Sequence, residues 1–398
     1  MLGRLGALTL VLVGGLAAVF VWPAPDPGRL WDRAITAFEA GRYDEAEAGL
    51  DRLGRLRAPT GRDWGLRARL AMARGRTDEA LSALGRIPDG HPLGSWARLR
   101  IGQLELRRHR LRVAEAALRH ALRLDPNLIA AQRELIYILG VQLRRRELDA
   151  AFQRLAERAS LSFRETWIWC MVPDLIWWAP EENEAVLRRC LEADPDDRWS
   201  RLALAEIYRR TARYDDAAAQ LAALPESDPD ARAARAQLAL EHRQDLDAAA
   251  ALLANGPADH PGLARLRGRL AMIRHDGAEA VRQFRIVYAA EPKRHASVSG
   301  LGAAYVLAGD PEAARPYLEA AQRFEALAIL LRQAGRWTEA DGRPDLLRQL
   351  GAACAAVGRP DQARAWYQLV ITHDPLDSEA QQALYRLRTS AATPPNSQ

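Results

Sequence analysis

The chain has 398 residues, about two to three times the usual size of one domain, and 48% of them are hydrophobic and 27% charged. This composition is globular and excludes a disordered chain, and three cysteines cannot form a disulfide framework or a four-thiolate zinc site. The formal net charge is +5, and only Lys293 among the 56 basic residues is a lysine. Because that bias reflects amino-acid usage, the charge is weak evidence for nucleic-acid binding.

An apolar segment opens the chain. Residues 5–22 carry no charge and approach the length that spans a bilayer as a helix, with Arg4 before them and a proline-rich stretch after them. Such a segment is either a cleaved signal peptide or a retained anchor. Cleavage after Ala24 places Trp22 where a small residue is needed, and cleavage after Ala17 falls inside the apolar run. We therefore favour an uncleaved anchor.

The anchor predicts an orientation and a first boundary. Positive charge ahead of the helix places the N-terminus in the cytoplasm and the remaining chain on the outer side. The sequence therefore predicts a single-pass membrane segment over residues 1–26, with everything that follows in the periplasm. Secretion of a soluble chain to the periplasm is the alternative.

An internal repeat follows the anchor. The hexapeptide at 41–46, Gly-Arg-Tyr-Asp-Glu-Ala, returns at 75–80 as Gly-Arg-Thr-Asp-Glu-Ala. The closing alanine, or a residue in its place, recurs at Ala46, Ala80, Ala114, Ala151, Asn183, Ala217, Ala249, Ala280, Ala314 and Ala363. As far as Ala314 the spacing is 31 to 37 residues, and the longest interval predicts an insertion of about three residues near 144–146.

Each repeat predicts two helices joined by a short turn. A glycine or polar residue ends the first helix, where a left-handed conformation is needed, and acidic residues open the second helix at its positive dipole end. Proline follows twelve residues after the small anchor residue in seven repeats, where it stops one helix and starts the next. Strands are not expected, because period-two alternation is almost absent.

This arrangement resembles the tetratricopeptide repeat family, whose pattern Leu301, Gly302, Tyr305 and Ala314 match best. Trp64 with Ala80 and Pro92, and Leu350 and Gly351 with Ala363 and Pro375, match it in part. The resemblance implies a membrane-anchored bacterial-type protein of this family, all-α, with a right-handed solenoid of about ten helical hairpins over residues 27–388. We expect an irregular helix at 324–335, a capping helix at 377–388 and a disordered tail at 389–398.

Catalytic motifs are missing from the sequence. It has no HExxH, phosphate-binding loop, dinucleotide fingerprint or nucleophile elbow, and no histidine pair at metal-binding helical spacing. We therefore predict no enzyme activity, no cofactor and no metal. The resemblance implies a non-catalytic scaffold that binds protein or peptide segments and assembles a complex. A soluble periplasmic adaptor, or an enzyme with an unrecognised site in the groove, remains as an alternative.

The segment 98–146 is strongly basic, with twelve arginines against four acidic residues. It could form a face for acidic protein, anionic lipid or nucleic acid, or its arginines could lie solvated on outward helix faces. We favour the second interpretation and predict no nucleic-acid partner, because no aromatic side chains alternate with these arginines. No small-molecule substrate is evident.

A tryptophan-rich stretch occupies 163–178. We place Trp167 in the core, and for Trp177 and Trp178 we hold core packing and an exposed aromatic patch to be equal alternatives. Pro173 should kink this helix. In an oxidising compartment, Cys170 could pair with Cys190 on the facing helix, but we favour two buried thiols.

The resemblance also predicts a partner-binding groove. In this family, positions two, five, nine and twelve of the first helix line the concave face, and counting back from the anchor residue assigns them here. The predicted partner-binding residues are Trp96, Leu99, Leu106, Ile136, Leu143, Ile168, Val172, Leu175, Trp199, Leu202 and Arg209. Most of these side chains are apolar, and exposed apolar surface usually marks a binding site.

Overall fold

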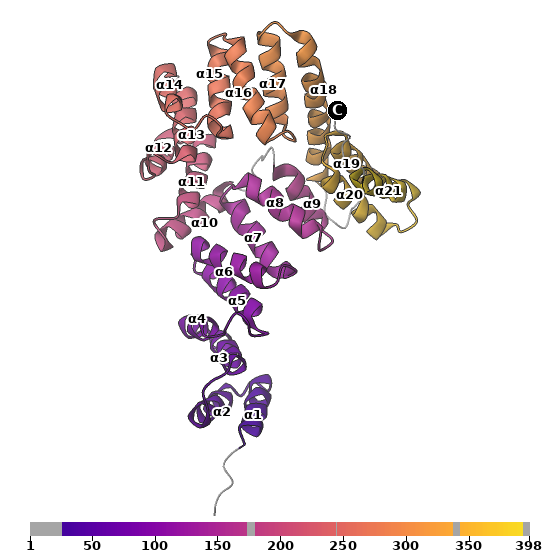
Figure 1. Ribbon diagram of the computed structural model, residues 1–398. Helices are drawn as coiled ribbons and strands as arrows, with labels where there is room; N and C mark the ends of the chain where they lie inside the picture. The colour runs from indigo at the N-terminus through magenta and orange to yellow at the C-terminus, as the bar shows by residue number, and fades with distance from the viewer. Residues whose placement is uncertain (1–25, 173–179, 244, 337–342, 393–398) are drawn as a thin grey trace, which may run out of the picture. The chain divides into compact units, whose positions relative to one another are not determined.

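The computed structural model describes residues 26–172, 180–243, 245–336 and 343–392, and every regular element in these ranges is a helix (Figure 1). The chain divides into two compact units, residues 1–87 and 88–398. None of the described helices is long and apolar enough to cross a membrane, and the predicted anchor at residues 5–22 lies outside the described ranges. The prediction of an all-α repeat structure is confirmed.

The first unit consists of two hairpins. Its helices are α1 (Pro27–Glu39), α2 (Tyr43–Leu56), α3 (Gly61–Ala73) and α4 (Thr77–Gly85). The first helix begins at Pro27 because the side chain of Asp26 accepts a hydrogen bond from the backbone of Gly28 and proline suits the first helical turn. A small core of alanine and leucine side chains, including Leu50 and Leu66, holds the helices together.

The second unit contains the remaining helices. They are α5 (Gly94–Arg107), α6 (Leu111–Leu124), α7 (Ile129–Val141), α8 (Arg145–Ala156), α9 (Phe163–Met171), α10 (Pro180–Ala193), α11 (Arg198–Arg210), α12 (Tyr214–Ala222), α13 (Pro229–Leu238), a π-helical turn η2 (Ala239–Arg243), α14 (Leu246–Ala254), α15 (Pro261–Ile273), α16 (Gly277–Ala290), α17 (His295–Leu307), α18 (Pro311–Ala334), α19 (Pro344–Ala356), α20 (Pro360–His373) and α21 (Ser378–Ala392). Most of them pair as hairpins with the next helix along the chain.

The predicted repeat positions have the expected physical role. All nine predicted anchor alanines are buried, with at most 1% of their surface exposed, and at eight of them, Ala151 excepted, the paired helices approach each other. The turn residue five positions earlier is left-handed in most repeats, as a glycine at Gly41, Gly75, Gly309 and Gly358. His109, Ala212 and His275 adopt the same conformation without glycine's freedom, which is strained for a residue with a β-carbon.

The fourth repeat corrects the predicted register. Leu143 is left-handed, with φ of 57°, and α7 has already ended at Val141. The equivalent anchor is therefore Leu148, which is 3% exposed and lies 34 residues after Ala114. The insertion predicted near 144–146 was wrong, because the anchor site here holds a leucine and Ala151 lies almost one helical turn beyond it.

The fifth repeat is the one in which the hairpin opens. Helix α9 makes its main contacts with α20 and α18, while α10 packs against α11. Asn183, the only predicted anchor that is not an alanine, is partly exposed on α10. Helix α9 ends at Met171, although Val172, the residue before the proline, still has helical backbone angles (φ −53°, ψ −45°). Pro173, which we expected to kink the helix, lies outside the described residues.

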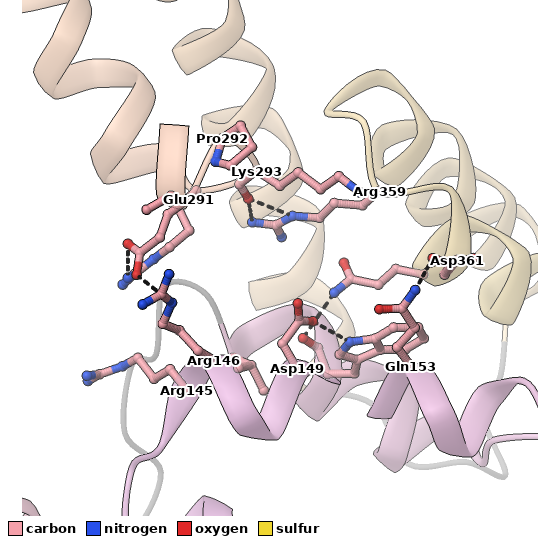
Figure 2. A pocket seen from close by; sticks show the side chains of 14 residues that line it. Arg145, Arg146, Asp149, Gln153, Glu291, Pro292, Lys293, Arg359 and Asp361 are labelled. Carbon is pink, nitrogen blue, oxygen red and sulfur yellow. Dashed lines mark hydrogen bonds and ion pairs between the residues drawn. The ribbon is translucent and has the colours of Figure 1, made fainter. Parts of the chain in front are cut away.

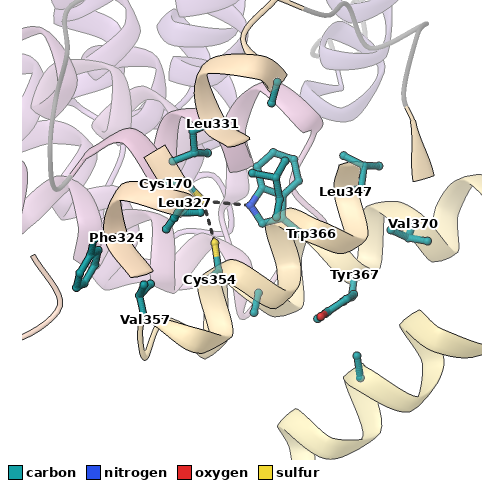
Figure 3. Packing of buried hydrophobic residues seen from close by; sticks show 14 of the residues in the cluster. Cys170, Phe324, Leu327, Leu331, Leu347, Cys354, Val357, Trp366, Tyr367 and Val370 are labelled. Carbon is teal, nitrogen blue, oxygen red and sulfur yellow. Dashed lines mark hydrogen bonds between the residues drawn. The ribbon is translucent and has the colours of Figure 1, made fainter. Parts of the chain in front are cut away.

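A single core joins α9 to the C-terminal helices (Figure 3). We call it the closure core; its members from these helices include Cys170, Phe324, Leu327, Leu331, Leu350, Cys354 and Trp366. The Nε1 atom of Trp366 donates a hydrogen bond to the Sγ atom of Cys170 at 3.2 Å, and the Sγ atoms of Cys170 and Cys354 are 3.8 Å apart. Chain segments almost 200 residues apart in sequence are thus packed side by side.

The cysteines are buried thiols, as we favoured for Cys170 and Cys190. All three are free, and Cys190 lies in a different core cluster from Cys170, so the alternative of a Cys170–Cys190 pair does not form. The reason is the open fifth repeat, which separates the two helices that carry them. Burial raises the pKa of the Cys190 thiol to about 12, so this group is protonated at neutral pH.

The C-terminal part differs from expectation in helix length. The extra residues after Ala314 extend α18 to 24 residues as one continuous helix, so the irregular helix expected at 324–335 is a regular continuation through Ala334. Helix α21 extends to Ala392, four residues into the segment expected as a disordered tail. Residues 393–398 lie outside the described ranges.

Candidate functional site

The predicted groove residues on α5 and α11 are only partly accessible. Leu99 is 6% exposed and belongs to a core cluster, against which Leu106 also packs. Trp96 and Leu202 are half-buried. Trp199 is half-buried as well, and the guanidinium carbons of Arg144 and Arg198 lie 4.8 and 4.2 Å from the centre of its ring. The accessible apolar surface at these positions is therefore discontinuous.

Two of the predicted groove residues on or next to α9 pack in the protein interior. Val172 is 1% exposed within a core cluster, and Ile168 packs against the same cluster. Both side chains contribute to the protein interior, as the open hairpin places this helix among the C-terminal repeats. Leu175, Trp177 and Trp178 lie outside the described residues, so the proposed exposed aromatic patch stays a prediction. Trp167 packs against the closure core, and its Nε1 atom donates to the carbonyl of Leu331 at 2.8 Å.

The register correction replaces the predicted residues on α7. Counting back from Leu148 moves the four groove positions to Ala130, Arg133, Tyr137 and Gly140. Ile136 packs partly buried against one core cluster and Leu143, in the turn after α7, against another. Tyr137 is instead 49% exposed. The binding role of these positions remains a prediction, but the residues that occupy them are different.

Charged side chains occupy the groove positions of the later repeats. Arg209 on α11 forms ion pairs with Glu206, at 3.0 Å, and with Glu241 of the next repeat, at 2.5 Å. Glu241 also pairs with Arg269 of α15 at 3.1 Å. Three successive repeats are thus linked across this face by alternating charges, in place of the apolar surface that the third to sixth repeats had suggested.

The same periodicity could have identified these residues. Counting back from Ala280 gives Arg265 and Arg269 as positions five and nine of the eighth repeat, and counting from Ala249 gives Glu241 as position twelve of the seventh. The prediction missed them because it sampled mainly the third to sixth repeats. The physical signal was a glutamate and two arginines at groove positions of adjacent repeats.

The ion pairs keep these carboxylates ionised. Burial raises the pKa of Glu206, but hydrogen bonds from Arg209 and the charges of Arg210 and Arg145 outweigh it, so the pKa lies below its usual value. Burial acts in the same direction on Glu241, and the charge of Arg209 again holds the pKa of that carboxyl low. This face therefore presents fixed charges at neutral pH.

The basic segment 98–146 is partly neutralised by ion pairs to acidic residues outside it. Arg112 forms a two-pronged pair with Asp194 (2.7 Å), and Arg133 pairs with Glu165 (2.7 Å). Arg98 pairs with Asp89 at 2.8 Å. Since these acidic partners lie outside the segment, its local excess of positive charge does not persist as a uniform basic surface.

A cavity of about 360 Å³ lies where α8, α9 and α20 meet the loop between α16 and α17 (Figure 2). Its charged lining residues are Arg145, Arg146, Asp149, Glu291, Lys293, Arg294, Arg359 and Asp361. The cavity exists because α9 has left its own hairpin, so it joins residues from four repeats that no single-repeat pattern connects.

Arg359 holds one wall of the cavity in place. Its guanidinium donates to the carbonyl of Lys293 at 2.6 Å and to the carbonyl of Cys170 at 3.4 Å. Only 5% of Arg359 is exposed. This side chain therefore links the α16–α17 loop to α9 and has a structural role. Among the described residues, no cluster of histidine, cysteine or acidic side chains is arranged to hold a metal ion.

Comparisons with known proteins identify the type of repeat. Two models of the tetratricopeptide repeat match the chain, one over residues 180–240 and the other over residues 66–129 and 265–327. No curated protein sequence matches the chain.

Similar solved structures include the Cut9–Hcn1 hetero-tetramer of APC/C (13% identity over 91% of this chain and 76% of that one, TM-score 0.38). They also include a human IFIT1 dimer with m7Gppp-AAAA (14%, 90% and 79%, TM-score 0.37) and yeast Tom70 (11%, 92% and 96%, TM-score 0.30). At these TM-scores the likeness supports no argument about overall shape or ligand. The matched repeats and the helical hairpins together identify the chain as a member of the tetratricopeptide repeat family.

Proposed function

We propose that this protein is a non-catalytic scaffold that binds protein segments through the first helices of its repeats. Tetratricopeptide repeats point to protein partners in general, and the proposal adds a surface. That surface consists of Trp96 on α5, Tyr137 on α7, and Trp199 and Leu202 on α11.

The observation that carries the proposal is the incomplete burial of these side chains. Tyr137 is 49% exposed, and the two tryptophans are half-buried although the chain has ample core in which to bury them. Full burial of an aromatic ring is worth about 1.5–3 kcal/mol, and each of these rings forgoes part of that energy, so folding alone does not favour this placement. Tryptophan and tyrosine are also the residues that contribute most to protein interfaces. The charged pairs on the neighbouring repeats would form a polar margin around them.

The test is capture of partners by the full-length protein and by a Trp96→Ala/Trp199→Ala double variant. We expect the variant to lose at least tenfold in captured partner, since aromatic anchors cost about 2 kcal/mol or more when truncated. Its melting temperature should stay within a few degrees of the wild type. A matched control is Trp64→Ala, a truncation in the first unit, which should capture normally. Equal capture by both variants would place the binding surface elsewhere.

We further propose that residues 5–22 tether the scaffold to a membrane, with the repeats on the periplasmic side. The support is the uncharged apolar sequence between Arg4 and Pro23. Full-length protein should remain with membranes after a carbonate wash, whereas a chain starting at Asp26 should be released. Recovery of the protein in the wash, with its N-terminus shortened by cleavage, would favour the soluble periplasmic alternative.

A further inference from the structure

The cavity in Figure 2 has an excess of positive charge. Five of its lining residues are cationic and three are acidic, which leaves an excess of two positive charges. Glu291 is shared, since it pairs with Arg294 at 2.5 Å and lies 3.9 Å from Arg146. Within the described ranges, Arg145 forms a single ion pair, with Glu206 at the long distance of 3.7 Å. The acidic groups therefore do not neutralise the cations around them.

Arg145 is a lining cation in unfavourable surroundings. Its side chain keeps 24% of its surface accessible, so it faces open space. Burial lowers the pKa of Arg145 to about 10; the charge of Glu206 opposes this shift, and those of Arg210, Arg294 and Arg265 add to it. Arg265 on α15, which does not line the cavity, has its pKa lowered by burial and by Arg294. A folded chain gains nothing by collecting these like charges unless an anion joins them.

Two further features of the cavity suit an anion. Helix α8 begins at Arg145 and α20 begins at Pro360, so the first turns of two helices, with their positive dipole ends, contribute to the lining. Lys293 is the only lysine in the chain, and its ammonium group makes no hydrogen bond or ion pair with the described residues. Arginine forks and helix N-termini both favour phosphate oxygens.

One lining residue, Gln362, also has a buried acceptor oxygen without a hydrogen-bond donor in the part of the chain that the structure describes. Gln362 is 3% exposed, and its Nε2 atom donates to the carbonyl of Trp169 at 3.2 Å. Because that carbonyl can only accept, the amide orientation is determined, and the atom left over is Oε1. No donor among the described residues reaches this oxygen. A buried acceptor without a partner is costly, and a ligand hydroxyl group would satisfy it.

We propose that this cavity binds the phosphate monoester of a small polyhydroxylated molecule. The phosphate carries about two negative charges near neutral pH, which matches the excess of the lining, and it accepts hydrogen bonds from Arg145 and Arg146. A hydroxyl group of the ligand donates to Gln362 Oε1. A cavity of about 360 Å³ lies at the small end of ligand sites and holds a sugar phosphate rather than a folded peptide segment. This inference does not depend on the proposed protein-binding surface.

The test is calorimetric titration of the full-length protein at low salt with four probes: glucose 6-phosphate, inorganic phosphate, glucose and succinate. We expect glucose 6-phosphate to bind, inorganic phosphate to bind more weakly and to compete with it, and neither glucose nor succinate to bind at the same concentrations. Raising the salt to 0.5 M should weaken both phosphate probes, because part of the attraction is electrostatic.

Three substitutions separate the contributions. Arg145→Gln should weaken both phosphate probes at least tenfold, since it removes a charge-assisted hydrogen bond. Gln362→Leu should weaken glucose 6-phosphate severalfold and leave inorganic phosphate unchanged. Arg315→Gln on α18, an exposed arginine outside the cavity, is the matched control and should bind as the wild type does.

Several results would overturn the proposal. They are no binding of glucose 6-phosphate to the wild type, equal affinity in Arg145→Gln, or succinate binding as tightly as the phosphate ester, which would indicate a dicarboxylate site. If Gln362→Leu fails to fold, Arg145→Gln and the competition by inorganic phosphate still decide the question. Arg145 is partly accessible and at the start of a helix, so its replacement should leave the melting temperature nearly unchanged.

Discussion

Trp366→Ala should destabilise the second unit by about 3–5 kcal/mol, the range for truncating a buried aromatic residue. Trp366 is completely buried in the closure core, where its ring meets Phe163 edge to face at 5.5 Å. Its Nε1 hydrogen bond to Cys170 also links α20 to α9. The truncation therefore removes both the largest side chain of this core and a polar contact between segments far apart in sequence. Urea unfolding followed by circular dichroism measures the loss.

The helices in which hydrogen exchange increases show whether the closure core holds α9 or serves only the C-terminal repeats. If α9 is held by the C-terminal helices, Trp366→Ala should increase hydrogen exchange of the α9 amides at least as much as that of α20. Trp366→Phe, which keeps most of the ring, should cost much less and leave α9 protected. Faster exchange confined to α19–α21, with α9 unchanged, would show that the fifth repeat does not depend on the closure.

Much of the hairpin architecture was predictable from the sequence, because each hairpin forms through local contacts. The anchor alanines mark where paired helices touch, and the glycines before them mark left-handed turns. Where the sequence replaced these residues, prediction became less exact. Leu148 in place of an alanine shifted the assigned register by three residues, and Leu143 in place of glycine concealed the turn. The structure identifies the turn at Leu143 from its left-handed backbone, and the anchor at Leu148 follows five residues later, as in the other repeats.

The closure was not predictable from the repeat pattern. Each repeat signal describes contacts within about 34 residues, whereas α9 and α20 are nearly 200 residues apart. One local indication was Asn183, since a polar residue at the anchor position disfavours a close helix pair. The tryptophan-rich composition of α9 also fits a helix that packs against more than its own hairpin, as Trp167 and Trp169 do.

One candidate site was predictable from the repeat pattern and the other was not. The charged pairs of Glu206, Arg209, Glu241 and Arg269 occupy positions that periodicity assigns, so they could have been found from the sequence. The cavity could not, because its walls come from four repeats that only the closure brings together. Arg145 and Gln362 have unremarkable positions in the sequence. Only their surroundings, like charges in one case and a missing donor in the other, distinguish them.

A second large effect is expected at Arg144, which connects the third, fourth and sixth repeats. Its side chain is 6% exposed and pairs with Glu115 at 2.5 Å and with Glu147 at 2.8 Å, while its guanidinium lies over Trp199. Arg144→Met should therefore cost about 3 kcal/mol, near the lower end for a broken buried ion pair, because Arg119 still neutralises Glu115. Urea unfolding at pH 7 measures this loss.

The double variant Glu115→Leu/Arg144→Met should be more stable than the sum of the two single variants predicts, since it leaves neither charge buried alone. This coupling should depend on pH in one direction. Burial raises the pKa of Glu115, but hydrogen bonds from Arg144 and Arg119 outweigh it and hold the pKa below its ordinary value of 4.5. The stabilisation is thus complete above pH 4.5 and is lost as the pH falls through the lowered pKa and the carboxylate takes up its proton. A coupling energy that is zero at pH 7, or that grows on acidification, would mean that the hydrogen bonds of Arg144 contribute nothing beyond the packing of its side chain on Trp199.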